Sequence, residues 1–215
     1  CLVGSEMCIR DSQYTNIRYP FPFDPPYVPQ DIPCGAYVHT FSYAKDVDAA
    51  KAFLNFEGVD SCFYVWINGE YVGYSQVSHM TGEFDVTDIL KEGENTIAVL
   101  VMKWCDGSYL EDQDKFRMSG IFRDVYILKR PECAIRDYRI TTSVLKEKAE
   151  VKLDLSFYQE TAVKVTIEDR NGVVVAEEQA EHDGAFTFEI IQPTLWNTEN
   201  PYLYTLILQL SLIHI

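Results

Sequence analysis

The chain has 215 residues, enough for two small domains, and a formal net charge of −15 at pH 7. Nucleic-acid partners are excluded, because phosphate contacts need clustered Lys and Arg and the 18 basic residues form no useful cluster. A hydrophobic share of 47% with 13% aromatics excludes a disordered chain, and no apolar run reaches the length that crosses a bilayer, so no membrane partner is expected.

The two ends of the chain read as foreign to the rest. Residues 1–12, CLVGSEMCIRDS, show no strand alternation. Residues 7–12 can be encoded by a DNA sequence whose reverse complement translates as residues 210–214 and begins an Ile codon, as at residue 215. Both ends therefore resemble one short DNA element read in opposite directions, similar to the transposase end of sequencing-library adapters. We exclude 1–12 and 210–215 from fold reasoning as adapter artefacts, while a genuine loop and a genuine final strand remain the alternative.

A proline-rich lead-in at 19–29, YPFPFDPPYVP, predicts an extended loop, since each Pro restricts itself and its predecessor. Short runs rich in Val, Ile, Tyr, Phe and Trp follow, bounded by Gly, Asn or Asp, which is the pattern of strands. These predicted strands are residues 36–43, 51–58, 62–67, 71–76, 95–104 and 121–130. Such spacing predicts an all-β sandwich.

Two Asn-Gly pairs predict hairpin turns, because a two-residue turn needs positive φ at both central positions. Asn68-Gly69 joins two predicted strands, and Asn171-Gly172 repeats the device later in the chain. Residues 86–95, VTDILKEGEN, give the one helical indication, a single turn.

A second strand series begins after a break at Pro131 and Glu132. Its alternation of apolar and polar residues predicts an immunoglobulin-like sandwich. The predicted strands are residues 138–145, 149–159, 162–169, 173–180, 185–191 and 203–210. We therefore expect two domains in tandem, 13–131 and 132–209.

The six cysteines include no CxxC and no His at zinc spacing, so neither a metal knuckle nor a disulfide framework is indicated. Cys34, Cys62, Cys105 and Cys133 lie in or beside apolar runs, where a free thiol acts as a small hydrophobe. A reducing, cytoplasmic compartment is expected.

The densest polar segment is 104–125, WCDGSYLEDQDKFRMSGIFRDV, which lies between two apolar strands. It places Asp106, Glu111, Asp112 and Asp114 in one connection. Such carboxylates can accept sugar hydroxyls, bind a hard cation or perform acid–base chemistry, and a solvated acidic loop is the simpler alternative. Four aromatic residues in the same segment favour a packed loop and a sugar site.

Residues 106–125 are very similar to the signature of the long β-galactosidases of glycoside hydrolase family 2. The segments 14–29, YTNIRYPFPFDPPYVP, 68–76, NGEYVGYSQ, and 83–95, EFDVTDILKEGEN, resemble the same family. The resemblance implies a jelly-roll, galactose-binding-like β-sandwich at 13–131, truncated before its first strand. A C-terminally truncated immunoglobulin-like β-sandwich follows at 132–209.

The resemblance also implies individual site residues. Asn16 of the YTN motif corresponds to the Asn that reaches the galactose hydroxyls, and Asp114 to the Asp that contacts both sugar and a sodium ion. Gln76 and Asp106 correspond to magnesium ligands whose companions lie upstream of this chain.

No catalytic residue is expected in this chain. Retaining glycosidases use two carboxyl groups about 5 Å apart, and in this family both are glutamates of a (β/α)₈ barrel that follows the second sandwich. The implied substrate is a terminal β-galactoside such as lactose, the implied parent is a homo-oligomer, a tetramer, and this piece alone is expected to be inactive.

Two alternatives remain. One is a stand-alone carbohydrate-binding module without catalysis. The other is a fragment of a sister enzyme, a β-glucuronidase or β-mannosidase, which shares the S-G-I-F-R-x-V segment.

Overall fold

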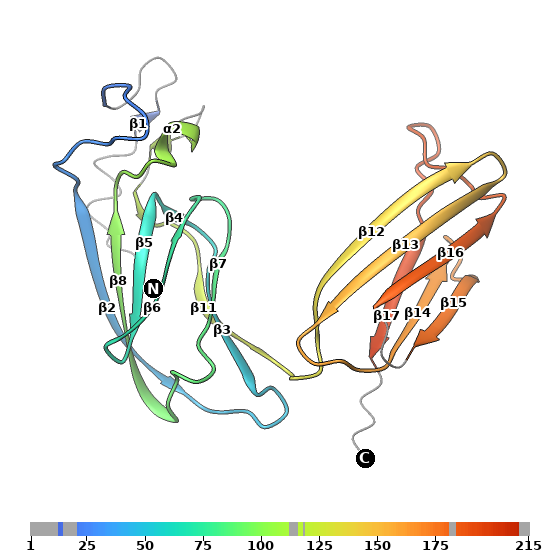
Figure 1. The fold of residues 1–215 in the computed structure, drawn as a ribbon, viewed down its shortest axis with the longest axis horizontal. Coiled ribbons are helices and arrows are strands. Elements are labelled where there is room, and N and C mark those ends of the chain that lie inside the picture. The colour runs from blue at the N-terminus through green and yellow to red at the C-terminus, as the bar shows by residue number, and fades with distance from the viewer. Residues whose placement is uncertain (1–12, 15–20, 112–115, 118, 181–183, 211–215) are drawn as a thin grey trace. The chain divides into compact units, whose positions relative to one another are not determined.

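The structure is a computed structural model that describes residues 13–14, 21–111, 116–117, 119–180 and 184–210. The chain divides into two compact units, Cys1–Arg130 and Pro131–Ile215, and each is described by itself (Figure 1). Within the described ranges, no helix is long and apolar enough to cross a membrane. The predicted artefacts at 1–12 and 210–215, and the truncations, stay predictions, although the structure places Leu210 at the end of a strand, paired with Val163.

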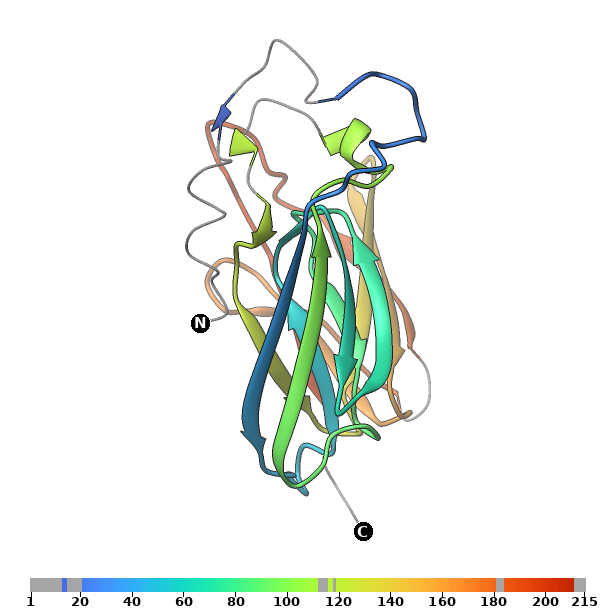
Figure 2. The same cartoon turned by 90° about the vertical axis from the view of Figure 1, so that its left-hand side faces the viewer.

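The first unit consists of two antiparallel sheets packed face to face. Figure 2 looks onto the larger sheet, in which β2 lies beside β8. Its order is β2 (Cys34–Tyr43), β8 (Gly93–Met102), β5 (Cys62–Ile67) and β6 (Glu70–Gln76). The opposing sheet has the order β11 (Val125–Arg130), β3 (Lys51–Phe56) and β7 (Gly82–Asp85).

Two short ladders close one end of this unit. β4 (Val59–Asp60) pairs with β10 (Gly120–Ile121), and β1 (Gln13–Tyr14) pairs with β9 (Phe116–Arg117). The second ladder joins segments about a hundred residues apart in the sequence, as the register shows.

The core of the first unit follows from strand alternation. Along β8, Ile97, Val99 and Val101 are buried while their neighbours are partly exposed, as expected for a strand with one face on a core. Phe56 and Phe63, 4.7 Å apart between ring centroids, join the two sheets. Aromatic pairs at this spacing add to the stabilisation from burial alone.

The Asn68-Gly69 hairpin is confirmed. Both residues have positive φ, 53° and 84°, as a type I′ turn requires. The Asn68 side chain also accepts a hydrogen bond from Thr96 N at 3.0 Å and donates to Asn95 Oδ1 at 2.9 Å. The turn is therefore fixed to the neighbouring strand as well as by its own geometry.

The second Asn-Gly pair does not repeat this turn, so that prediction was wrong in detail. Only Gly172 of the pair has positive φ, 78°, and Gly172 N donates to Asp169 O at 3.0 Å. Asp169 Oδ1 accepts from Asn171 N and Val173 N, which builds a longer loop around the carboxylate. The helical indication at 86–95 forms a turn at 87–89 and then the start of β8 at 93–95, whereas a short helix, α2 (Ser108–Glu111), forms where none was predicted.

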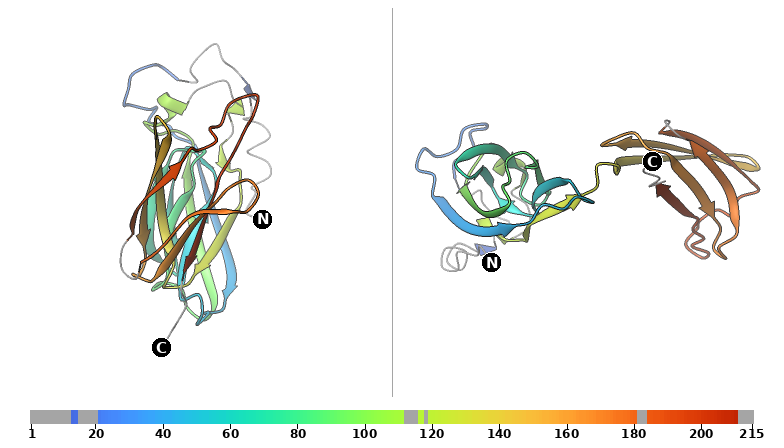
Figure 3. Two further views of the ribbon diagram at one scale, coloured as in Figure 1. Left: turned by 90° about the vertical axis from the view of Figure 1, so that its right-hand side faces the viewer. Right: turned by 90° about the horizontal axis from the view of Figure 1, so that it is seen from below.

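The second unit also has two antiparallel sheets (Figure 3). One has the order β12 (Ile135–Leu145), β13 (Lys148–Phe157) and β16 (Ala185–Ile191). The other has the order β15 (Val174–Ala180), β14 (Val163–Glu168) and β17 (Thr205–Leu210). Leu153, Val165 and Phe188 are among the buried residues between them. The prediction of an all-β fold built from two sandwiches is confirmed.

Candidate functional site

The aromatic and acidic segments singled out in the sequence meet beside α2, at one end of the first unit (Figure 1). Tyr109 of α2 donates its hydroxyl hydrogen to Tyr27 O at 2.5 Å and accepts from Asp24 N at 3.1 Å. The Phe21 ring lies 5.0 Å from Trp104 and 5.2 Å from Tyr109 between centroids, edge to face. The lead-in 21–27 is therefore attached to the segment that contains α2.

The β1–β9 ladder is a second link between the same segments. Tyr14 pairs with Phe116 and Gln13 with Arg117. The predicted substrate-binding residues Asn16 and Asp114 each lie two positions from this ladder in the sequence but fall outside the described residues. The structure thus joins their neighbouring strands and leaves both assignments as predictions.

The acids of this segment have different surroundings. Glu111 accepts hydrogen bonds from Ser78 N at 2.8 Å and Ser78 Oγ at 2.6 Å, so it fixes α2 to the turn after β6. Asp106 is exposed, and its Oδ1 accepts from Gly107 N at 2.9 Å. Asp112 and Asp114 lie outside the described residues. Glu111 therefore has a structural role, and the sequence analysis did not distinguish it from the other acids.

The two predicted magnesium ligands come from neighbouring segments. Gln76 ends β6 and is half-buried, and its Oε1 accepts from Tyr74 Oη at 2.8 Å. A Cβ placed on Gly107, next to Asp106, would lie 3.9 Å from the Gln76 amide nitrogen. The amide and carboxylate oxygens suit a hard cation, which needs more donors than these two. Among the described residues, no group of three or more His, Cys, Asp or Glu side chains is placed to hold a metal ion.

Two buried thiols lie next to the turn formed by Asp106 and Gly107. Cys62 starts β5, Cys105 precedes Asp106, and their thiols are hydrogen-bonded to one another. The hydrogen bond from Cys62 lowers the pKa of Cys105 to about 7. The same contact, together with burial, raises the pKa of Cys62. The sequence analysis treated these cysteines as separate small hydrophobes. Their proximity follows from the register of β5 on β8, which places Cys62 opposite Met102.

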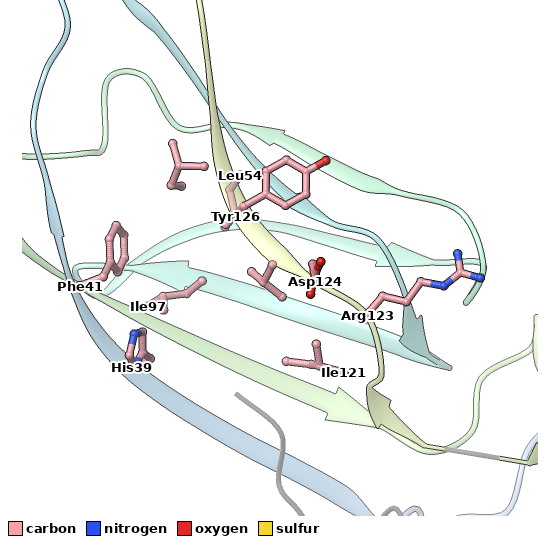
Figure 4. A pocket seen from close by; sticks show the side chains of 10 residues that line it. His39, Phe41, Leu54, Ile97, Ile121, Arg123, Asp124 and Tyr126 are labelled. Carbon is pink, nitrogen blue, oxygen red and sulfur yellow. The ribbon is translucent and has the colours of Figure 1, made fainter. Parts of the chain in front are cut away.

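A cavity of about 540 Å³ lies elsewhere in the first unit, along the edge strands β2 and β11 (Figure 4). His39 and Phe41 line it from β2, Tyr126 and Ile127 from β11. Gln76 and Asp106 are not among its lining residues, and β6, which holds Gln76, is at the opposite edge of the sheet from β2. The cavity is mainly apolar and does not form part of the candidate site.

Two β-sandwiches in succession along the chain, the first with an aromatic and acidic loop at one end, define an all-β, two-domain class of protein. Comparison with family models identifies the family. Residues 5–131 match the model described as "Glycosyl hydrolases family 2, sugar binding domain", and residues 133–214 match "Glycosyl hydrolases family 2". The chain belongs to glycosyl hydrolase family 2.

The curated relatives are longer proteins. A β-galactosidase of Staphylococcus xylosus is 48% identical over 196 residues, which cover 90% of this chain and 20% of that protein. A β-galactosidase of Actinobacillus pleuropneumoniae is 49% identical over 198 residues, 91% of this chain and 19% of that protein. The chain thus spans about a fifth of the length of these relatives.

Solved structures show the same fold. A β-glucuronidase from an uncultured Clostridium species has a TM-score of 0.66 at 24% identity, covering 84% of this chain and 33% of that one. A β-glucuronidase of Ruminococcus gnavus has a TM-score of 0.65 at 21% identity, covering 82% and 32%. At this identity the likeness supports the jelly-roll and immunoglobulin-like architecture alone.

Proposed function

We propose that this chain is the sugar-binding domain and most of the following immunoglobulin-like domain of a retaining β-galactosidase, which hydrolyses terminal β-D-galactosides such as lactose. The observation that carries the proposal is the identity of 48% and 49% to two β-galactosidases over nine-tenths of the chain. In this proposal a downstream barrel supplies both catalytic glutamates, and this chain alone is inactive.

The role of this chain is to shape one side of the substrate pocket. Asn16 and Asp114 bind the galactose hydroxyls, so that the sugar is held in one orientation for the barrel. The β1–β9 ladder and the Tyr109 hydrogen bonds support this role, since both attach the lead-in that follows residue 13 to the segment 104–125. A substrate-binding edge needs this kind of rigid support.

Two cations complete the proposal. Sodium, bound by Asp114, orients sugar hydroxyls, and magnesium, bound in part by Gln76 and Asp106, ties the end of β6 to the turn before α2. The proximity of Gly107 to the Gln76 amide supports the second site, because one ion can then contact both segments. The remaining magnesium donors come from outside this chain or from water. We further propose a cytoplasmic, homotetrameric parent enzyme.

The alternatives differ in measurable ways. A β-glucuronidase or β-mannosidase parent shares the fold, as the solved β-glucuronidases illustrate at 24% and 21% identity, but the sequence is much more similar to β-galactosidases. A stand-alone module would bind galactose without a barrel, whereas the proposed fragment has only one side of a pocket.

A chimera tests the proposal. Residues 13–209 replace the matching segment of the S. xylosus β-galactosidase, and hydrolysis of nitrophenyl β-galactoside and β-glucuronide is measured. We expect galactoside turnover within about tenfold of the parent and no glucuronide turnover, because a domain that is 48% identical should preserve the pocket. A folded chimera that prefers the glucuronide, or micromolar galactose binding by the isolated chain, would contradict the proposal.

A further inference from the structure

The Cys62–Cys105 pair has no part in the proposed sugar site, and its geometry is unusual. Cys62 is fully buried and Cys105 is 6% exposed. Because β5 pairs with β8, Cys62 lies opposite Met102, and the chain turns back within three residues to bring Cys105 to the same strand end. The two thiols are in hydrogen-bond contact.

Neighbouring serines hold the two segments together. Ser61 Oγ lies 3.0 Å from Ser108 Oγ, and Cys105 N donates to Ser108 Oγ at 3.1 Å. Ser61 N also donates to Met102 O at 3.1 Å. The start of β5 is thus linked to α2 through two serine hydroxyls and to the end of β8 through one backbone hydrogen bond, which holds Cys62 near Cys105.

We propose that Cys62 and Cys105 form an oxidative modification site that takes a peroxide and closes to a disulfide. Cys105, the less buried thiol, attacks the peroxide, and the O–O bond breaks as an S–O bond forms, giving a sulfenic acid and one water. The Cys62 sulfur then displaces the sulfenic oxygen, an S–S bond forms, and a second water leaves with both thiol protons accounted for. The thiols are oxidised and the peroxide is reduced.

Geometry distinguishes this pair from the other described cysteines. A disulfide needs sulfurs about 2 Å apart and suitably oriented Cβ atoms, so it can form only between thiols that already lie near one another. Cys62 and Cys105 interact with each other through their thiols. The Cys34 thiol instead donates to Ile32 O, and the Cys133 thiol contacts the Gln159 side chain.

The modification would act on the candidate cation site. Cys62 lies opposite Gln76 in the β5–β6 ladder, and Cys105 immediately precedes Asp106. A Cβ on Gly107 would lie 3.4 Å from the Cys105 sulfur, so that sulfur borders the turn that contains Asp106. This consequence rests on the proposed role of Gln76 and Asp106, whereas formation of the bond does not.

The test uses a full-length chain in which Cys1, Cys8, Cys34 and Cys133 are replaced by serine, so that only Cys62 and Cys105 remain. The chain is treated with hydrogen peroxide, then alkylated under denaturing conditions and mapped without reduction by mass spectrometry. We expect loss of both free thiols, one cross-linked peptide, and recovery of both thiols with a reductant. The Cys62→Ala variant should instead stop at an oxidised Cys105 without the cross-link.

Peroxide treatment of the same chain in denaturant is the matched control, because it removes the contact and keeps the thiols. A much lower cross-link yield in denaturant supports a fold-encoded site, and this comparison holds even if Cys62→Ala does not fold. Equal yields in both states, or a folded chain whose thiols stay fully alkylatable, would overturn the proposal. Failure of the galactosidase chimera would leave this result unaffected.

Discussion

The Tyr109 hydroxyl holds residues 21–27 to α2, and one substitution can remove it with little other change. The Tyr109→Phe variant keeps the ring contact with Phe21 and loses the hydrogen bonds to Tyr27 O and from Asp24 N. A net contribution of roughly 0.5–1.5 kcal/mol for each bond predicts a loss of about 1–3 kcal/mol, since Tyr109 is only 8% exposed and its partners gain little water.

Urea unfolding followed by fluorescence of the three tryptophans measures this loss, and hydrogen exchange locates it at residues 21–27. Tyr71→Phe is the matched control, because Tyr71 is 54% exposed and its replacement should change stability by less than about 0.5 kcal/mol. An unchanged free energy of unfolding with unchanged exchange at residues 21–27 would refute the idea that this hydroxyl anchors the lead-in.

Three further predictions test other parts of the account. A double-mutant cycle on Ser78→Ala and Glu111→Ala should give a coupling of about 1–3 kcal/mol in urea unfolding, because the Ser78 hydroxyl donates to the Glu111 carboxylate at 2.6 Å; simple additivity would exclude that contact. Gly73→Ala should destabilise the first unit by about 1–3 kcal/mol, since the new methyl would lie 2.6 Å from the Phe84 ring, and a neutral effect on the unfolding midpoint would show that the ring moves freely. Backbone hydrogen bonds from Val173 and Asn171 lower the pKa of Asp169 below its ordinary 3.8, so its stabilising effect is present above that pH and is lost as pH falls through the lowered pKa; an NMR titration showing a pKa at or above 3.8 would contradict this.

Strand positions were largely predictable because apolar alternation is local. The predicted strand 62–67 is observed unchanged as β5, and 185–191 as β16. β4 and β7 were missed, since one is two residues long and the other, GEFD, has little strand propensity and forms through pairing with β3. Such strands depend on contacts distant in sequence.

The candidate site was predictable only where a motif identifies it. The resemblance named Gln76 and Asp106, and the structure brings Gln76 against the turn that follows Asp106. Two contacts could not be predicted: the hydrogen bond from Ser78 to Glu111, and the contact of Cys62 with Cys105. Each depends on which strands pair and in which register. The sequence shows which chemical groups a loop carries, but not which residues they contact in the fold.

Asp114 provides the most direct test of the central claim that this chain shapes a galactoside pocket. In the S. xylosus chimera, kcat/KM for nitrophenyl β-galactoside is measured against sodium concentration for the unmodified domain, for Asp114→Asn, and for Asp88→Asn, an exposed carboxylate of the same unit. We predict that Asp114→Asn lowers kcat/KM by at least about a hundredfold and abolishes the sodium response, while Asp88→Asn changes neither. Unchanged kinetics and an unchanged sodium response in Asp114→Asn would contradict the account.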